Sequence, residues 1–399
     1  MRRGWQQLRE AVRNGFWAVP TGCVGLAVIL SLALVRLDRS RSASLSFTFG
    51  AGPDGAREVL SAITTAMITF TGLVFSITVV VLQLTSQQFS PRVLRTFLRD
   101  RLTQYALGVF TATFVYAVMV LRTVSSGDDD DAFVPAIATT FALVLLLLSV
   151  GLFVAYIHHI ATAVQASSII AAIGRETRHA LDVRFPSGTR EPVGGGAGPA
   201  PDAPPSLVLP APKGGVLTTV DEAALVELAC AAGVVLRSGA RLGDYVPEGA
   251  PLLEVVGDAA GLDVTAVLRA FDQGRDRTLQ QDVAFGLRQL VDVAERALSP
   301  GINDPTTAVQ CLDQLHDLLR RLVTRPLRTG RHADSSGAVR LVMPPDRMED
   351  LLALALDEIE QYGADAAPVQ RRIDALLADL ASAALPDHRT AVSERQLRR

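Results

Sequence analysis

The sequence predicts a mainly α-helical protein, with a polytopic membrane domain of four spans followed by a cytosolic α+β region that holds a small β module and a helical bundle. Three observations support this fold class. The 399-residue chain has a mean hydropathy of +0.29 and only 20% charged residues, which is unusual for a soluble protein. Four stretches before residue 160 lack charge over the roughly 20 residues that cross a bilayer. Later in the chain, apolar residues recur at the spacing of amphipathic helices.

The four predicted spans follow these uncharged stretches. We interpret the first as a retained anchor, because its apolar run exceeds the roughly 7 to 15 residues of a signal-peptide core. The spans are Asn14–Val35, Val59–Pro91, Leu102–Leu121 and Ala132–Ile157.

Arginines flank the spans unequally. Four lie before the first span and four lie between the second and third spans, whereas four consecutive aspartates, Asp128 to Asp131, dominate the third link. By the positive-inside rule, we expect a multi-pass membrane protein with both termini cytoplasmic. Arg36, Arg39, Arg41 and Arg57 in the first outer loop weaken this bias. Residues 1–160 carry 13 arginines and 9 acids, so a basic membrane half precedes an acidic half.

The remaining composition argues against several function classes. A net charge of -3 disfavours nucleic acid as a partner, because nucleic-acid binders carry a concentrated basic face. Cys23, Cys230 and Cys311 lie far apart without metal-ligand spacing, so we expect no metal site. The sequence contains no phosphate-binding loop with a lysine, no nucleophile elbow and no His-Glu-x-x-His pair. We therefore predict no catalytic residue, no cofactor and no enzyme.

Composition divides the chain into five segments. Residues 1–183 form the four-span domain, 184–212 a Pro/Gly-rich linker, 213–260 a small β-containing module, 261–388 a helical cytosolic domain and 389–399 a basic tail that we expect to be frayed.

Within these segments, Gly243–Val255 resembles the strand-and-turn edge of a barrel-sandwich hybrid. A carrier role does not follow, because the only lysine, Lys213, precedes the first strand of that module. The segment Arg325–Pro345 contains several Gly and Pro breakers, which predict a loop. One helix of the cytosolic domain is predicted by a buried face of Val283, Leu287, Leu290, Val291, Ala294 and Leu298.

The second span carries the most functional information. It has no charge over 33 residues, yet hydroxyls occur along its length. At about 100° per residue they form two stripes. One stripe comprises Thr64, Thr71, Thr78 and Thr85, and the other comprises Thr65, Thr69, Gly72, Ser76 and Gln83. The remaining apolar face, which we expect to contact lipid, comprises Ile63, Phe70, Val74, Ile77, Val81 and Leu84.

Two interpretations of these stripes remain open. Small and hydroxyl residues allow close helix packing within a monomer or an oligomer. Alternatively, they form a neutral polar lining for an ion or a small solute. In the second case Thr71, Ser76 and Thr78 face a shared path. The candidate pore or interface residues are Thr64, Thr71, Ser76, Thr78, Gln83 and Thr85.

A second candidate lies at the corner Leu298–Ala308. Asp304 is placed as a helix N-cap, and Pro305 occupies the first helical position, where a missing N–H has no cost. One interpretation is a tightly specified structural corner. The other is that free N–H groups, with Asn303 and the hydroxyls of Thr306 and Thr307, bind a ligand or a partner loop, although Asp304 disfavours an anion.

Three motifs together carry a family resemblance. They are Thr69–Arg101, Phe285–Asp292 and Ser299–Thr307. With them the chain resembles, over nearly its whole length, a bacterial family of predicted membrane proteins catalogued as domain of unknown function 2254. The resemblance implies an integral protein of the bacterial plasma (inner) membrane and assigns no catalytic residue.

Together these observations predict a passive channel or transporter-like homo-oligomer with a cytosolic sensing or scaffolding domain. Its expected partners are the lipid bilayer, further copies of the chain and an ion or small solute, and nucleic acid is not among them. The alternative is a membrane-anchored signalling or scaffold protein whose spans only anchor and dimerise.

Overall fold

The computed structural model describes residues 17–40, 52–88, 101–125, 133–163, 165–187, 203–279 and 281–399. They form two compact units, Met1–Gln165 and Ala166–Arg399, which we call the membrane unit and the C-terminal unit. The predicted fold class is confirmed, with four apolar helices first and small sheets with further helices after them. Apart from Arg101, both arginine-rich flanks lie outside the described residues, as do the four aspartates and most of the predicted linker.

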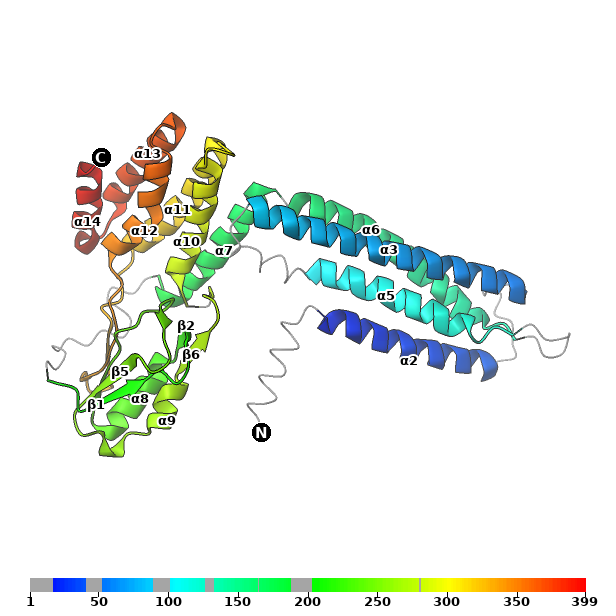
Figure 1. Cartoon of the computed structure of the whole chain (residues 1–399), viewed down its shortest axis with the longest axis horizontal. Helices are drawn as coiled ribbons and strands as arrows, with labels where there is room; N and C mark the ends of the chain where they lie inside the picture. The colour runs from blue at the N-terminus through cyan, green and yellow to red at the C-terminus, as the bar shows by residue number, and fades with distance from the viewer. Residues whose placement is uncertain are drawn as a thin grey trace. The chain divides into compact units, whose positions relative to one another are not determined.

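Four helices of the membrane unit are long and apolar enough to cross a bilayer, as predicted. They are α2 (Ala18–Ser40), α3 (Pro53–Gln88), α5 (Arg101–Leu121) and α6 (Ala136–Ala163) (Figure 1). Half of the apolar window of α5 is buried, against 22% or less for each of the other three. Helix α5 is therefore the central helix of this unit.

Close packing holds α5 against its neighbours. A Cβ atom on Gly108 of α5 would lie 3.0 Å from the sulfur of Cys23 and 3.3 Å from Cα of Pro20, so glycine permits the approach of α2. A cluster of buried apolar side chains joins α3, α5 and α6 through Met67, Tyr116 and Ala142. Van der Waals contact of this kind is the main force between helices in lipid.

The C-terminal unit contains two small sheets. The five-stranded sheet has the order β1-β5-β3-β8-β7, and the three-stranded sheet has the order β4-β2-β6. Only the β3–β8 pair is parallel among the strand pairs described. The strands are β1 (Leu207–Pro210), β2 (Gly215–Val220), β3 (Val235–Arg237), β4 (Tyr245–Val246), β5 (Pro251–Val256), β6 (Phe271–Gly274), β7 (Arg331–Ala333) and β8 (Val339–Val342).

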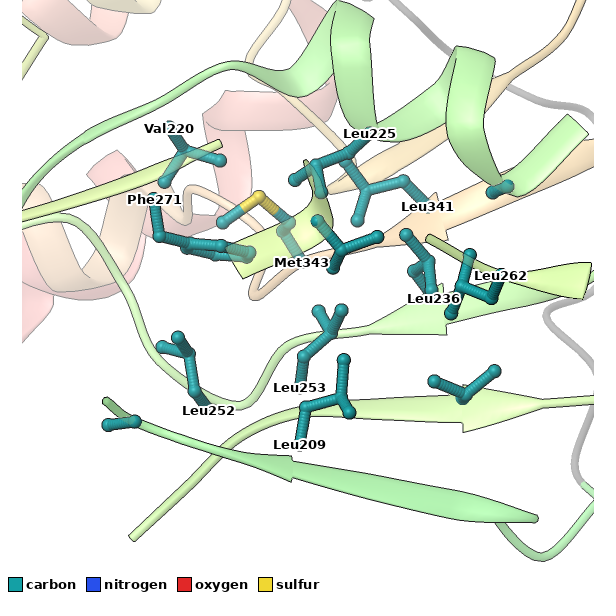
Figure 2. Close-up of a cluster of buried hydrophobic side chains, with 14 of the residues drawn as sticks. Leu209, Val220, Leu225, Leu236, Leu252, Leu253, Leu262, Phe271, Leu341 and Met343 are labelled. Atoms are coloured by element: carbon teal, nitrogen blue, oxygen red, sulfur yellow. The ribbon is translucent and has the colours of Figure 1, made fainter. Parts of the chain in front are cut away.

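One apolar core joins these strands to α8 (Glu222–Ala232) and α9 (Val264–Arg269). Figure 2 shows Leu225, Leu236 and Leu341 meeting in this core, from a helix and two strands. Asp221 begins α8 as its N-cap, because its carboxylate accepts the backbone N–H of Ala224.

The sheets extend beyond the predicted β module. Strand β1 lies within the predicted linker and pairs with β5, and the predicted loop Arg325–Pro345 contains β7 and β8. The glycines in this segment predicted a loop, but Gly330 instead allows a close approach between two parts of the backbone. It adopts a φ of +74°, and a Cβ atom there would overlap the carbonyl oxygen of Met343. Pairing with distant strands therefore stabilises segments too short to be recognised locally.

Six helices complete the C-terminal unit among the described residues. They are α7 (Ala166–Arg184), α10 (Val283–Leu298), α11 (Pro305–Val323), α12 (Met348–Tyr362), α13 (Ala367–Ala383) and α14 (Pro386–Leu397). The predicted buried face of α10 is confirmed. Helix α7 packs on α10 and α11, so the boundary between the units lies at residue 165, whereas the sequence placed it at 183.

The predicted frayed tail is wrong, because α14 continues through it to Leu397. Arg395 forms ion pairs with Asp357 and Glu360 of α12, and Arg399 lies 2.9 Å from Asp374 of α13. Acids on neighbouring helices therefore bind the basic end of the chain.

The contact between α7 and α10 generates a prediction. A Cβ atom on Gly286 would overlap the side chain of Thr177, so Gly286→Ala should lower the free energy of unfolding of residues 166–399 by about 1–3 kcal/mol. Urea unfolding measures this change. Gly239→Ala is the control, because nothing lies within 4 Å of the added atom. Thr177→Ala should partly restore the stability of the Gly286→Ala protein, and equal stability of all variants would contradict the close contact.

Candidate functional site

The apolar face of α3 that we expected to contact lipid is packed inside the membrane unit. Val74 is fully buried with Phe110 and Tyr156, and Phe70 and Ile77 pack against this cluster. The expectation is wrong because both the packed face and the lipid face of a membrane helix are apolar, so hydropathy does not distinguish them.

The stripe of Thr64, Thr71 and Thr78 lies beside this packed face and is half-buried. Each hydroxyl donates to the carbonyl four residues earlier, at 2.7–2.8 Å. The Thr78 hydroxyl also lies 3.0 Å from the hydroxyl of Tyr156 on α6. These bonds are made within one copy of the chain and support the packing interpretation for this stripe. Thr85 belongs to α3, but its side chain is outside the described residues.

The second stripe lies on the outer surface of the unit. All five of its residues are exposed, and they lie within about 40° of the direction opposite Val74 at about 100° per residue. A Cβ atom on Gly72 would have no neighbour within 4 Å. Thr65 and Thr69 donate their hydroxyl hydrogens to carbonyls of α3 at 3.0 and 2.9 Å. The outer stripe consists of Thr65, Thr69, Gly72, Ser76 and Gln83.

The structure thus separates residues that we expected to share one path. Ser76 is exposed on the outer stripe, whereas Thr71 and Thr78 flank the packed face. Their grouping in one inward face is wrong within a single copy, because Ser76 and Thr78 are two residues apart and two residues turn a helix by about 200°.

Large side chains fill the interior of the membrane unit. The rings of Phe70 and Phe153 stack at 4.6 Å between centroids, and Phe110 lies against both. One turn along, the hydroxyls of Thr113 and Ser149 lie 3.2 Å apart and are buried. At this level the space between α3, α5 and α6 is therefore occupied by protein atoms.

The corner before α11 has the predicted local structure. Asp304 is the N-cap and accepts the backbone N–H of Thr307 at 3.1 Å and its hydroxyl at 2.6 Å, while Pro305 begins the helix. These two bonds hold the pKa of Asp304 below its ordinary value of 3.8. Asn303 adopts a φ of 48°, a left-handed conformation that asparagine tolerates. Asn303 and Thr306 are exposed, so binding of a partner loop at this corner stays a prediction.

The carboxylate of Asp38 makes a polar contact in the membrane unit that the sequence did not predict. Asp38 lies near the end of α2, beyond the predicted end of the first span. Its two carboxylate oxygens accept the backbone N–H groups of Ile137 and Ala138, each at 3.0 Å. The carboxylate therefore caps the N-terminus of α6, where the helix dipole favours negative charge. No local signal reveals this cap, because it comes from another helix.

We expect Asp38→Ala to destabilise the membrane unit by about 1–2 kcal/mol, because two N–H groups lose their acceptor. Thermal unfolding of the full chain in detergent, followed by the accessibility of Cys23 to a thiol reagent, measures the loss. Asp38→Asn keeps one acceptor oxygen and should be intermediate. Equal midpoints for parent and Asp38→Ala would show that the cap contributes nothing.

At the corner, Asp304→Ala should lower the free energy of unfolding of residues 166–399 by about 1 kcal/mol, whereas Asp304→Ser should retain most of it because serine also caps helices. Urea unfolding checks both variants. If both variants have the parent's free energy of unfolding but abolish function in cells, the structural interpretation fails and the ligand interpretation is favoured.

Known proteins similar to this chain support its assignment to a family. The family described as predicted membrane protein (DUF2254) matches residues 13–379. Uncharacterised proteins of Mycobacterium bovis and Mycobacterium tuberculosis are 34% identical over 395 residues, which cover 96% of this chain and 75% of theirs. No solved structure matches. The chain therefore belongs to the DUF2254 family of predicted membrane proteins, as its motifs indicated.

Proposed function

We propose that the chain is a passive channel or transporter-like homo-oligomer, in which the outer stripes of α3 from several copies meet around a shared path. The observation that carries this proposal is the position of that stripe. Its residues lie opposite the packed face of α3, where a helix that only anchors a monomer would present apolar side chains to lipid.

Two chemical properties support contact between copies along this stripe. Gly72 has open space around it, so its lack of a side chain serves no contact within one copy. It would allow close approach of a second helix. Gln83 is exposed at the same face, and an amide without a partner is costly in hydrocarbon.

The same stripe has suitable chemistry for an ion or a small solute. Thr65 and Thr69 each donate a hydrogen to their own helix, which leaves the oxygen lone pairs as acceptors. Neutral oxygens of this kind replace the hydration shell of a permeating ion. Because aromatic side chains fill the interior of one membrane unit, the path would run between copies.

That filled interior also favours a second candidate function. In this alternative the spans anchor and associate, and the C-terminal unit is a signalling or scaffold module without transport. The outer stripe would then be a packing surface only. Both proposals place the lipid bilayer and further copies of the chain among the partners, and neither involves enzymatic activity or nucleic acid.

The proposed location is the bacterial plasma membrane, with both termini in the cytoplasm. This orientation rests on the arginine counts before the first span and between the second and third. It would place the C-terminal unit in the cytosol, where a sensing or scaffolding role is possible.

The proposal is tested by measuring the rate at which ions or small solutes leave vesicles that contain the purified full chain. Ser76→Trp adds a bulky ring to the outer stripe without altering the packed face, so it should reduce flux at least tenfold. The oligomer should persist. Leu147→Trp is the control, because Leu147 is 72% exposed and belongs to another helix, α6, and its flux should match the parent.

A third variant distinguishes a blocked pore from an unfolded membrane unit. Thr78→Trp should unfold the membrane unit, because Thr78 contacts Tyr156 within one copy. If Ser76→Trp instead dissociates the oligomer, the stripe is a packing surface. Absence of flux from the parent across a range of salts and small osmolytes would favour the anchored scaffold.

A further inference from the structure

A cleft of about 270 Å³ lies inside the C-terminal unit. It forms where the end of α7, the segments around β7 and β8, and the first turns of α10 and α12 meet. Its lining combines charged side chains with apolar ones. The apolar ones include Phe185, Leu242, Val283, Met343, Leu351 and Leu354.

Each carboxylate that lines the cleft already forms an ion pair with an arginine. Asp282 binds Arg277 at 2.8 Å, Asp346 binds Arg184 at 3.0 Å and Asp350 binds Arg241 at 3.1 Å. Glu222 uses both of its oxygens for Arg328. The acidic groups are therefore engaged and do not form a free set of oxygen ligands for a cation.

The donors that remain are cationic. The side chain of Arg328 is 13% exposed, and its Nε–H is buried without an acceptor among the described residues. Arg347 lines the cleft and is exposed, and its side chain makes no hydrogen bond or ion pair with the described residues. Because every lining carboxylate already has another arginine, the Arg347 guanidinium leaves the cleft with one uncompensated positive charge.

His332 contributes to this wall as a neutral group. Burial lowers its pKa below the ordinary 6.5, Glu222 opposes this shift, and Arg328 and Arg184 add to it. The positive excess near neutral pH therefore comes from Arg347, because Glu222 balances the charge of Arg328.

We propose that this cleft binds a small organic anion, whose oxyanion group is held by Arg347 and Arg328 and whose apolar part lies against Leu351, Leu354 and Met343. Guanidinium groups bind carboxylate and phosphate oxygens through paired, charge-assisted hydrogen bonds. The cleft volume is near the lower limit of small-molecule pockets, which span roughly 300–1,000 Å³, so the ligand has the size of a metabolite.

The test uses the purified full chain in detergent at fixed ionic strength, with two probes. Pyrophosphate represents phosphate oxygens and citrate represents carboxylate oxygens. Calorimetric titration should show saturable binding of at least one probe, and the probe that binds identifies the oxyanion class. Arg347→Gln should weaken this binding at least tenfold. The substitution leaves folding intact, because Arg347 makes no side-chain capping bond to α12.

Two further variants make the result specific to the cleft. Arg371→Gln removes an exposed arginine of α13, which lies outside the cleft, and should bind like the parent. Leu354→Glu places a competing carboxylate on the apolar wall and should abolish binding, while Leu354→Met should retain it. The proposal is overturned if neither probe binds at millimolar concentration, or if Arg347→Gln and Arg371→Gln weaken binding equally. None of these outcomes depends on flux, so the cleft and the channel are tested separately.

Discussion

Inside a bilayer no water is available to the backbone or to hydroxyl side chains, so each buried polar group needs a partner within the protein. The membrane unit meets this requirement locally. Thr64, Thr71 and Thr78 bond to their own helix, Tyr116 donates to the carbonyl of Ala138, and Thr113 pairs with Ser149. Close packing and these few bonds between helices then hold the unit together, with α5 in the middle. The outer stripe of α3 is the feature that this internal arrangement leaves unexplained.

The C-terminal unit differs, because charge pairs join its parts. Arg288 of α10 lies within 4 Å of Asp292, Glu295 and Glu358, and so ties α10 to α12. Burial, with the neighbouring charge of Glu358, raises the pKa of Glu295. Similar pairs enclose the cleft, where the balance shifts toward unpaired arginine. The structural network of ion pairs and the proposed anion site thus both use arginine. They differ in whether each arginine has an acidic partner.

Local sequence patterns predicted those parts of the fold that depend on neighbouring residues. The uncharged spans, the face of α10 and the cap at Asp304 each have a signal within one helix. Strand β8 and the packed face of α3 depend on distant partners, so their local patterns were misleading. The sequence likewise predicted only part of the candidate site. Hydroxyl spacing identified the two stripes, but only the fold shows that Ser76 faces outward and Thr78 faces Tyr156.

The cap supplied by Asp38 has a consequence for biogenesis. Its partners at the start of α6 lie 99 and 100 residues later in the chain, so the carboxylate is synthesised long before the amides that it binds. Until the fourth helix inserts, that charge has to remain hydrated at the membrane surface, because a lone carboxylate is costly in hydrocarbon. Arrival of α6 supplies its partners. This cap therefore forms only in a chain whose first and last apolar helices are both in place, so an unfinished bundle retains an uncapped carboxylate.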